Sequence, residues 1–222
     1  WLAGALQRFG LVRPDKRRPL LTHGFHVPGD FDETRHHQLE LWTHFLTHFG
    51  LEASPDLSPL ASPPRGDGLV VGLIAGSENN PEKRWPVAHW CDLIGRLPAN
   101  AKVVLFGTAT DRAITDEISA RCGRSVDNLA GRTNLREYCE ALQRCTVLVT
   151  NDTGGMHLAN ALGVPLVALF GPTNPVRTRP VFEAPVTILQ PPGCPETGGG
   201  ALVELLPDQV AAALVPHLQQ AV

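Results

Sequence analysis

The sequence lacks the features that mark several large classes of protein. No run of 18 apolar residues occurs, so no segment has the length that a membrane-spanning helix needs. The opening residues 1–4 (WLAG) lack the basic and long apolar stretches of a secretory signal peptide. The formal net charge is only −3, whereas proteins that bind nucleic acid present a strongly basic face. These absences favour a globular cytoplasmic protein without a nucleic-acid partner.

The sequence also lacks the patterns that indicate disulfide bonds, a zinc site or dinucleotide binding. The five cysteines are Cys91, Cys122, Cys139, Cys145 and Cys194, and no C-x-x-C pair occurs. An odd number at irregular spacing argues against a disulfide framework or a zinc knuckle and is typical of reduced cytosolic thiols. No G-x-G-x-x-G pattern follows the apolar run 69–74, which argues against a dinucleotide-dependent dehydrogenase.

What the chain does contain is typical of a folded protein rich in turns. Its 222 residues allow one large domain or two small ones. Hydrophobic residues make up 43% and charged residues 18%, a balance that favours a packed core over disorder. Glycine and proline number 21 and 20 and indicate many tight backbone sites. Residues 54–67 carry four prolines and no helical period, so they are predicted to be a linker.

A helix is predicted before the linker, over residues 31–49. Apolar residues recur there at steps of three and four, namely Leu39, Trp42, Leu46 and Phe49. Asp30 or Asp32 is expected to cap its start, and Gly50 is expected to end it. His37, His44 and His48 fall within about 40° on its helical wheel. The spacing of the last two histidines could chelate a metal, but a solvated or interface face is favoured.

After the linker, strands and helices alternate. Short apolar runs predict strands at residues 69–74, 101–106, 126–129, 146–150, 165–170 and 186–189. Helices are predicted between or after them at residues 86–97, 111–122, 134–144, 155–162 and 207–218. This alternation predicts a parallel sheet with right-handed crossovers. Because ligands bind such sheets at the carboxyl ends of the strands, the loops after the strands are the candidate sites.

The strongest candidate is the loop 150–157 (TNDTGGMH), which follows a strand and opens a helix. Gly154 and Gly155 let the backbone approach a ligand closely, and the helix start with its dipole suits a phosphate. Thr153 can add a hydroxyl donor. The alternative is that Asp152 or Thr153 only caps the helix. Capping alone does not require this whole run, so phosphate binding is favoured.

Three further loops lie at the same predicted edge. In the loop 76–86, Ser77 is small and Lys83 could neutralise a diphosphate, although a Lys-Arg pair in a loop is usually solvated charge. Asp111 could accept the hydroxyls of a ribose or serve as an N-cap, and its spacing does not decide between them. The loop 130–135 could contact a base or a ribose, but a helix start capped by Asn134 explains it equally simply.

Taken together, these segments resemble glycosyltransferase family 9, the nucleotide-heptose:lipopolysaccharide heptosyltransferases. The motifs that carry the resemblance are residues 83–86 (KRWP), 129–135 (LAGRTNL) and 151–157 (NDTGGMH), the last continuing to residue 173. The resemblance covers nearly all of residues 68–222 and is weaker over residues 1–50.

The resemblance implies an α/β fold of the GT-B type, with a Rossmann-like parallel sheet that carries helices on both faces. Residues 1–53 would be the remnant of an incomplete N-terminal acceptor-binding domain and 54–67 a linker. Residues 68–206 would be the donor-binding domain. Residues 207–222 would form a C-terminal helix that packs back on the N-terminal part. The implied partners are ADP-heptose or a similar nucleotide-sugar and a lipopolysaccharide core acceptor, with a peripheral contact to the inner face of the inner membrane.

The resemblance also implies a role for each motif residue, without metal or cofactor. The residues that would hold the donor diphosphate are Ser77, Lys83, Thr153, Gly154 and Gly155. Asp152 would face the donor sugar, Asp111 would bind the ribose, and Thr133 would lie near the base. Met156 and His157 would support the loop.

The implied reaction transfers the sugar with inversion of configuration. A carboxylate base would deprotonate the acceptor, and cationic and N–H groups would stabilise the leaving diphosphate. The family's base lies near the start of its first domain, whereas residues 1–4 resemble a later part, so no residue is assigned as the base. The alternatives are a non-catalytic nucleotide-binding module and another nucleotide-sugar enzyme of the GT-B fold.

Overall fold

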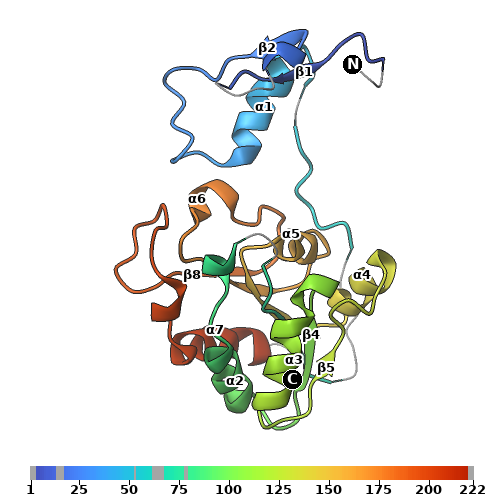
Figure 1. Cartoon of the computed structure of the whole chain (residues 1–222), viewed down its shortest axis with the longest axis vertical. Coiled ribbons are helices and arrows are strands. Elements are labelled where there is room, and N and C mark those ends of the chain that lie inside the picture. Colours follow the sequence, from blue (N-terminus) through green and yellow to red (C-terminus); the bar gives the residue numbers. More distant parts are fainter. Residues whose placement is uncertain (1–3, 14–17, 53, 62–67, 78–79, 220–222) are drawn as a thin grey trace. The chain divides into compact units, whose positions relative to one another are not determined.

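The computed structural model describes residues 4–13, 18–52, 54–61, 68–77 and 80–219. The chain divides into two compact units (Figure 1). Unit 1 comprises Trp1–Asp56 with Val176–Thr178, and unit 2 comprises Leu57–Pro175 with Arg179–Val222. The boundary after Asp56 therefore falls inside the segment predicted to be a linker, of which residues 62–67 lie outside the described residues.

Unit 1 contains a small parallel sheet and one longer helix. Strand β1 (Phe9–Leu11) pairs with β2 (His23–Phe25), and a short 3₁₀ helix, η1 (Arg18–Leu20), lies between them in the chain. The longer helix is α1 (Gln38–His48). Phe25 and Leu41 are the buried apolar side chains among the described residues of unit 1. Its core is therefore small.

The start of α1 corrects the prediction of a helix from residue 31 with an aspartate cap. The N-cap is His37, whose Nδ1 accepts a hydrogen bond from Leu39 N at 3.1 Å. The Glu40 carboxylate accepts from His37 N at 3.3 Å and completes a capping box. Asp32 is engaged elsewhere, because its Oδ1 accepts from the Thr34 amide at 2.9 Å in a local turn. The predicted end is confirmed, since Gly50 has a φ of +81°.

The other histidines on α1 contact aromatic rings. His44 lies edge-on to Phe31 at a centroid distance of 5.4 Å, and His48 contacts Phe25 at 5.1 Å. Within the described ranges, no group of three or more His, Cys, Asp and Glu side chains is arranged to hold a metal ion. These histidines therefore take part in capping and packing.

Unit 2 is built on a six-stranded parallel sheet with the strand order β5-β4-β3-β6-β7-β8. The strands are β3 (Val70–Ile74), β4 (Lys102–Phe106), β5 (Asp127–Asn128), β6 (Val147–Asn151), β7 (Leu166–Leu169) and β8 (Val186–Leu189). All six predicted strands are confirmed, with bounds that differ by one residue at most. The chain winds outward in one direction from β3 and in the other from β6, so the topological switch point lies between these two strands.

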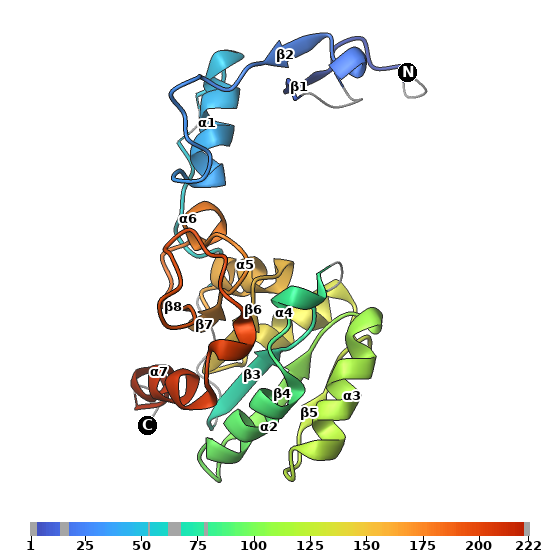
Figure 2. The same cartoon turned by 60° about the vertical axis from the view of Figure 1, so that its left-hand side comes forward.

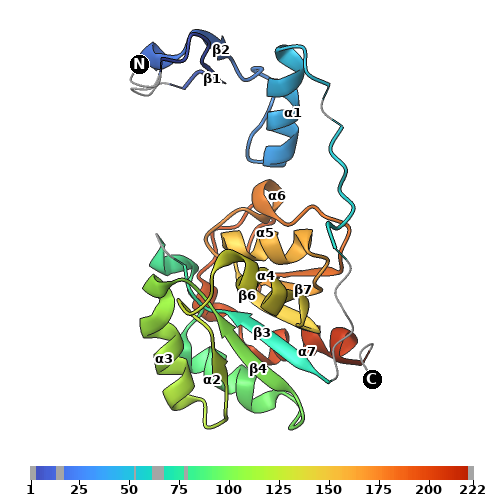
Figure 3. The same ribbon diagram turned by 90° about the vertical axis from the view of Figure 1, so that its right-hand side faces the viewer.

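Helices cover both faces of this sheet (Figure 3). Helices α2 (Val87–Arg96), α3 (Arg112–Arg121) and α7 (Pro207–Gln219) pack on one face, in a core that includes Trp90, Ile118 and Leu214. Figure 2 shows α2 and α3 side by side on this face. Helices α4 (Leu135–Gln143) and α5 (Gly154–Ala161) pack on the other, around Leu142 and Met156.

Several short helices complete the fold. They are η2 (Pro81–Lys83), η3 (Ala109–Asp111), α6 (Pro175–Thr178) and η4 (Leu202–Glu204). Each spans three or four residues, which is too short for an apolar period to reveal it in the sequence. None of the helices in the described part of the chain has the length and apolar character required to cross a membrane.

Candidate functional site

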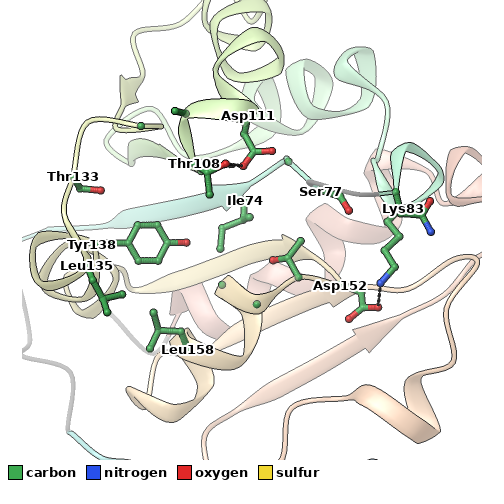
Figure 4. Close-up of a pocket in the computed structure, with 18 of the residues that line it drawn as sticks. Ile74, Ser77, Lys83, Thr108, Asp111, Thr133, Leu135, Tyr138, Asp152 and Leu158 are labelled. Carbon is green, nitrogen blue, oxygen red and sulfur yellow. Dashed lines mark hydrogen bonds and ion pairs between the residues drawn. The ribbon is translucent and has the colours of Figure 1, made fainter. Parts of the chain in front are cut away.

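A cavity of about 810 Å³ opens in unit 2 beside the switch point of the sheet (Figure 4). Its walls come from the loops after β3, β4, β5 and β6, which all leave the sheet at the carboxyl ends of parallel strands. The cavity collects eight of the residues that the sequence marks as site candidates: Ser77, Lys83, Asp111, Thr133, Asp152, Thr153, Gly154 and Gly155. Parallel strands bring these residues together because their carboxyl ends share one edge.

An ion pair spans the part of the cavity between η2 and β6. Lys83 Nζ lies 2.8 Å from Asp152 Oδ2, and the Asp152 side chain is only 8% exposed. The backbone of η2 presents Lys83 here because Asn80 Oδ1 caps the short helix by accepting from Glu82 N at 3.0 Å. Lys83 is therefore not a freely solvated charge, which was the alternative considered from the sequence.

The neighbouring arginine has a different task. Arg84 Nε and Nη2 donate to the carbonyl oxygen of Ser77 at 3.1 and 2.8 Å. This contact fastens the two ends of the loop that follows β3. Arg84 does not line the cavity within the described chain. Of the Lys-Arg pair, Lys83 therefore lines the cavity, and Arg84 stabilises the loop.

A buried asparagine joins this loop to β6. Asn151, fully buried at the end of β6, donates from Nδ2 to the carbonyl oxygen of Ala75 at 2.8 Å. Its Oδ1 accepts from Trp85 N at 3.4 Å, and Trp85 Nε1 donates in turn to Leu205 O at 2.8 Å. Sequence reasoning missed this role of Asn151. A polar residue closing an apolar strand is the signal that could have revealed it.

The start of α5 has no side-chain cap from its N-cap residue. Thr153 occupies the N-cap position with an extended backbone, but its side chain makes no capping bond. Its Oγ1 is buried without a hydrogen-bond partner among the described residues. The Asp152 carboxylate is paired with Lys83. Capping therefore does not explain Asp152 and Thr153, and the buried hydroxyl of Thr153 has no hydrogen-bond partner in the described chain.

The two glycines of α5 serve different purposes. A Cβ at Gly154 would meet no atom within 4 Å, so the backbone here faces open space. A Cβ at Gly155 would lie 2.7 Å from both Ile74 Cδ1 and Tyr138 Oη. Gly154 leaves room for a ligand, whereas Gly155 permits close packing of the helix on its neighbours.

Asp111 occupies the N-cap position of α3, but its side chain makes no capping bond to that helix. Its Oδ2 accepts from Thr108 N at 2.9 Å and from Thr108 Oγ1 at 2.8 Å, which closes the first turn of η3. Its Oδ1 is buried and has no partner in the described part of the molecule. A Cβ at Gly76 would lie 2.1 Å from this atom. One oxygen therefore holds the local turn, and the other is buried beside Gly76 and accepts no hydrogen bond within the described chain.

The far wall of the cavity is largely apolar. It includes the side chains of Ile74, Leu135, Tyr138 and Leu158, with Thr133 at its edge (Figure 4). Tyr138 packs edge-on against Phe106 at 5.5 Å, and burial raises the pKa of its phenol well above the ordinary value. Leu135 is 71% exposed at the start of α4. Sequence reasoning missed this wall, although the i, i+3 spacing of Leu135 and Tyr138 places them on one helix face.

Of three further candidate residues, Asn134 and Met156 contribute to structure, and Asn134 also lines the cavity. Asn134 caps α4 as predicted, since its Oδ1 accepts from Glu137 N at 3.0 Å in a capping box. Met156 is fully buried in the core beneath α5, and His157 is exposed. Neither Met156 nor His157 is among the described residues that line the cavity.

Comparisons of the sequence with known proteins all find heptosyltransferases. Residues 48–197 match the family model described as glycosyltransferase family 9 (heptosyltransferase). Lipooligosaccharide heptosyltransferase 2 of Haemophilus influenzae is 40% identical over 123 residues, which are 53% of this chain and 36% of that protein. Lipopolysaccharide heptosyltransferase 2 of Escherichia coli is 41% identical over 117 residues, covering 50% and 34%. The matched part thus spans about a third of each curated relative.

The fold is similar to that of a solved structure from the same family. The structure of the E. coli ADP-heptose lipopolysaccharide heptosyltransferase II superimposes with a TM-score of 0.67 and 27% sequence identity. The match covers 98% of this chain and 71% of that one. The expected α/β fold of the GT-B type is therefore confirmed.

Proposed function

The chain belongs to glycosyltransferase family 9, the heptosyltransferases, and on that premise we propose that unit 2 binds a nucleotide-heptose donor. The donor is ADP-heptose or a close analogue, and the sugar is transferred to a hydroxyl of a lipopolysaccharide core acceptor. The proposed enzyme is an inverting glycosyltransferase of lipopolysaccharide biosynthesis.

One observation carries this proposal. An ammonium, an uncapped helix start and two buried oxygens without hydrogen-bond partners among the described residues converge on a single cavity at the switch point of a parallel sheet. Buried polar atoms are nearly always hydrogen-bonded in folded proteins. Thr153 Oγ1 and Asp111 Oδ1 are therefore best explained as atoms that a polar ligand completes.

We propose one orientation for the donor in the cavity. The diphosphate lies at the start of α5, between the hydroxyl of Thr153, the backbone at Gly154 and the ammonium of Lys83. The ribose hydroxyls donate to Asp111 Oδ1, and the base rests against the apolar wall near Thr133. The sugar extends on the other side toward Asp152. The cavity has room for such a ligand, since its volume of about 810 Å³ lies within the roughly 300–1,000 Å³ of small-molecule pockets.

Two groups of the chain would lower the barrier to transfer. The bond between the sugar and the diphosphate breaks as negative charge develops on the leaving oxygen. Lys83 and the N–H groups at the start of α5 stabilise that charge, and they do so effectively because the site is preorganised. No residue of the described chain is assigned as the base that deprotonates the acceptor. We further propose that the reaction takes place in the cytoplasm at the inner face of the inner membrane, because a lipopolysaccharide core acceptor is attached to a lipid.

Isothermal titration calorimetry with ADP and ADP-heptose tests the proposal. Both ligands are expected to bind the 222-residue chain. Lys83→Met is expected to raise the Kd of ADP at least tenfold, because a charge-assisted hydrogen bond to phosphate is lost. Lys102→Met is the matched control, since Lys102 is exposed at the amino end of β4, away from the cavity. The proposal fails if the wild-type chain binds neither ligand, or if both variants weaken ADP equally.

A further inference from the structure

The charged side chains that line the cavity are mainly negative, and the proposed ligand is negative as well. Among the described residues that line it, the charged ones are Lys83, Asp111 and Asp152, so carboxylates outnumber cations. The Lys83 ammonium is moreover engaged, with Nζ 2.8 Å from Asp152 Oδ2. A site that only had to attract a diphosphate would gain from a free lysine without a buried carboxylate beside it.

We propose that Asp152 is a specificity-determining residue that weakens binding of the free nucleoside diphosphate relative to the sugar-linked nucleotide. This inference rests on the proposed function and adds to it a discrimination between the sugar-linked nucleotide and the free nucleoside diphosphate. The cavity would therefore hold the donor more tightly than the nucleotide that remains after transfer.

The two ligands differ in charge at the terminal phosphate. A free terminal phosphate loses a second proton with a pKa of about 6, as a phosphate monoester does. Attachment of a sugar removes that ionisation, because the oxygen is esterified. At neutral pH the free nucleoside diphosphate thus carries about one more negative charge than the sugar-linked form, and the extra charge sits on the phosphate nearest to the sugar site.

The geometry places this extra charge close to Asp152. A phosphate oxygen bound to Lys83 would lie within hydrogen-bond reach of Nζ, on the same ammonium that contacts Asp152 Oδ2. The phosphate and the carboxylate would then be separated by about 5–6 Å, a distance at which like charges repel appreciably in a protein site. The side chain of Asp152 is 8% exposed, so solvent and salt screen this repulsion poorly.

The sugar changes the situation of the carboxylate. When a phosphate shares the Lys83 ammonium, the ion pair with Asp152 weakens, and a buried carboxylate whose charge is less well compensated is costly. Sugar hydroxyls of the donor can donate hydrogen bonds to Asp152 and compensate for the weaker ion pair. The free diphosphate offers no donor at this position and adds repulsion. After transfer, the same carboxylate therefore favours release of the nucleotide.

Calorimetric titrations of the full 222-residue chain test this inference. Asp152→Asn keeps the shape and removes the charge, and it is expected to lower the Kd of ADP about tenfold. The Kd of ADP-heptose is expected to stay unchanged or to rise. Glu82→Gln is the matched control, because it removes one exposed carboxylate next to Lys83 but outside the described cavity lining. It should leave both affinities within about twofold.

A second measurement changes the ligand in place of the protein. The β-methyl ester of ADP removes the extra charge without adding sugar hydroxyls, so it should bind the wild-type chain several-fold more tightly than ADP. The difference should disappear in Asp152→Asn. This comparison remains informative in the wild-type chain even if the variant does not fold.

Several outcomes would overturn the inference. Unchanged or weaker ADP binding in Asp152→Asn would contradict it, as would equal tightening of ADP and ADP-heptose. Equal affinities of ADP and its methyl ester for the wild-type chain would also contradict it. In each of these cases nucleotides still bind and the proposed function stands. A wild-type chain that binds no nucleotide would remove both proposals.

Discussion

At the scale of single residues, the two carboxylates that line the cavity each have more than one interaction to account for. Asp111 uses one oxygen for the turn of η3 and presents the other without a partner in the described chain. Asp152 forms an ion pair with Lys83 and is proposed to contact the sugar of a bound donor. On the proposed function, both folding and binding constrain these positions, and only substitutions that change one property at a time separate the two.

The two glycines of α5 give a direct test of such separate constraints. Gly155→Ala is expected to destabilise the chain by about 1–3 kcal/mol, because its methyl group would overpack the core. The atoms in its way are Ile74 Cδ1 and Tyr138 Oη, each at 2.7 Å. Gly154→Ala is expected to change stability by less than about 0.5 kcal/mol, since its Cβ meets nothing within 4 Å.

Urea denaturation followed by circular dichroism measures both effects. Gly154→Ala should instead weaken ADP binding, because its methyl group occupies the space proposed for the diphosphate. Equal stability losses for the two variants would show that the packing at Gly155 is not the distinguishing feature.

At the scale of elements, local capping determines where helices begin. Both α1 and α4 start with capping boxes, one built on His37 and the other on Asn134. The second was predicted because asparagine is a common N-cap residue. The first was missed because aspartates earlier in the chain are better cap formers in general. Asp32 is instead held in its own turn by Thr34.

The cap of α4 is expected to contribute measurably to stability. Asn134→Ala should lower the free energy of unfolding by about 1 kcal/mol, because the amide of Glu137 loses its acceptor. Asn134→Ser is the matched control, since serine caps helices about as well as asparagine. Urea titrations of the three proteins measure the effect. A serine variant as unstable as the alanine variant would show that the cap is not the cause.

At the scale of the whole molecule, the two units differ in the core they possess. Unit 2 buries side chains on both faces of its sheet, whereas the described part of unit 1 buries Phe25 and Leu41. Hydrophobic burial is the main favourable contribution to folding. Most of the cooperative stability of the chain is therefore expected to reside in unit 2, which also contains the cavity.

Ligand binding should reveal this distribution of stability. At about 100 times its Kd, ADP should add about 2.7 kcal/mol to the free energy of unfolding of unit 2. Differential scanning calorimetry should show one dominant transition that moves up by roughly 5–10 °C. If saturating ADP binds but leaves the midpoint temperature of the dominant transition unchanged, the main cooperative unit lies outside unit 2.

The sequence by itself determined the strands and the longer helices of unit 2 and the edge of the sheet at which to look for a site. These features follow from local information, because apolar runs define strands and parallel strands present their carboxyl ends together. The resemblance to family 9 assigned roles to the loop residues, but it could not state how their side chains are paired.

Only the tertiary structure decided those pairings. Lys83 and Asp152 are 69 residues apart, and Asn151 and Ala75 are 76 residues apart. Their contacts depend on the register of β3 against β6 and on the packing of the loops that follow. A pattern within one segment cannot report such contacts, since the partner of each group is brought to it by a different part of the chain. The opposition between a cation and a buried carboxylate inside the cavity is a property of the fold.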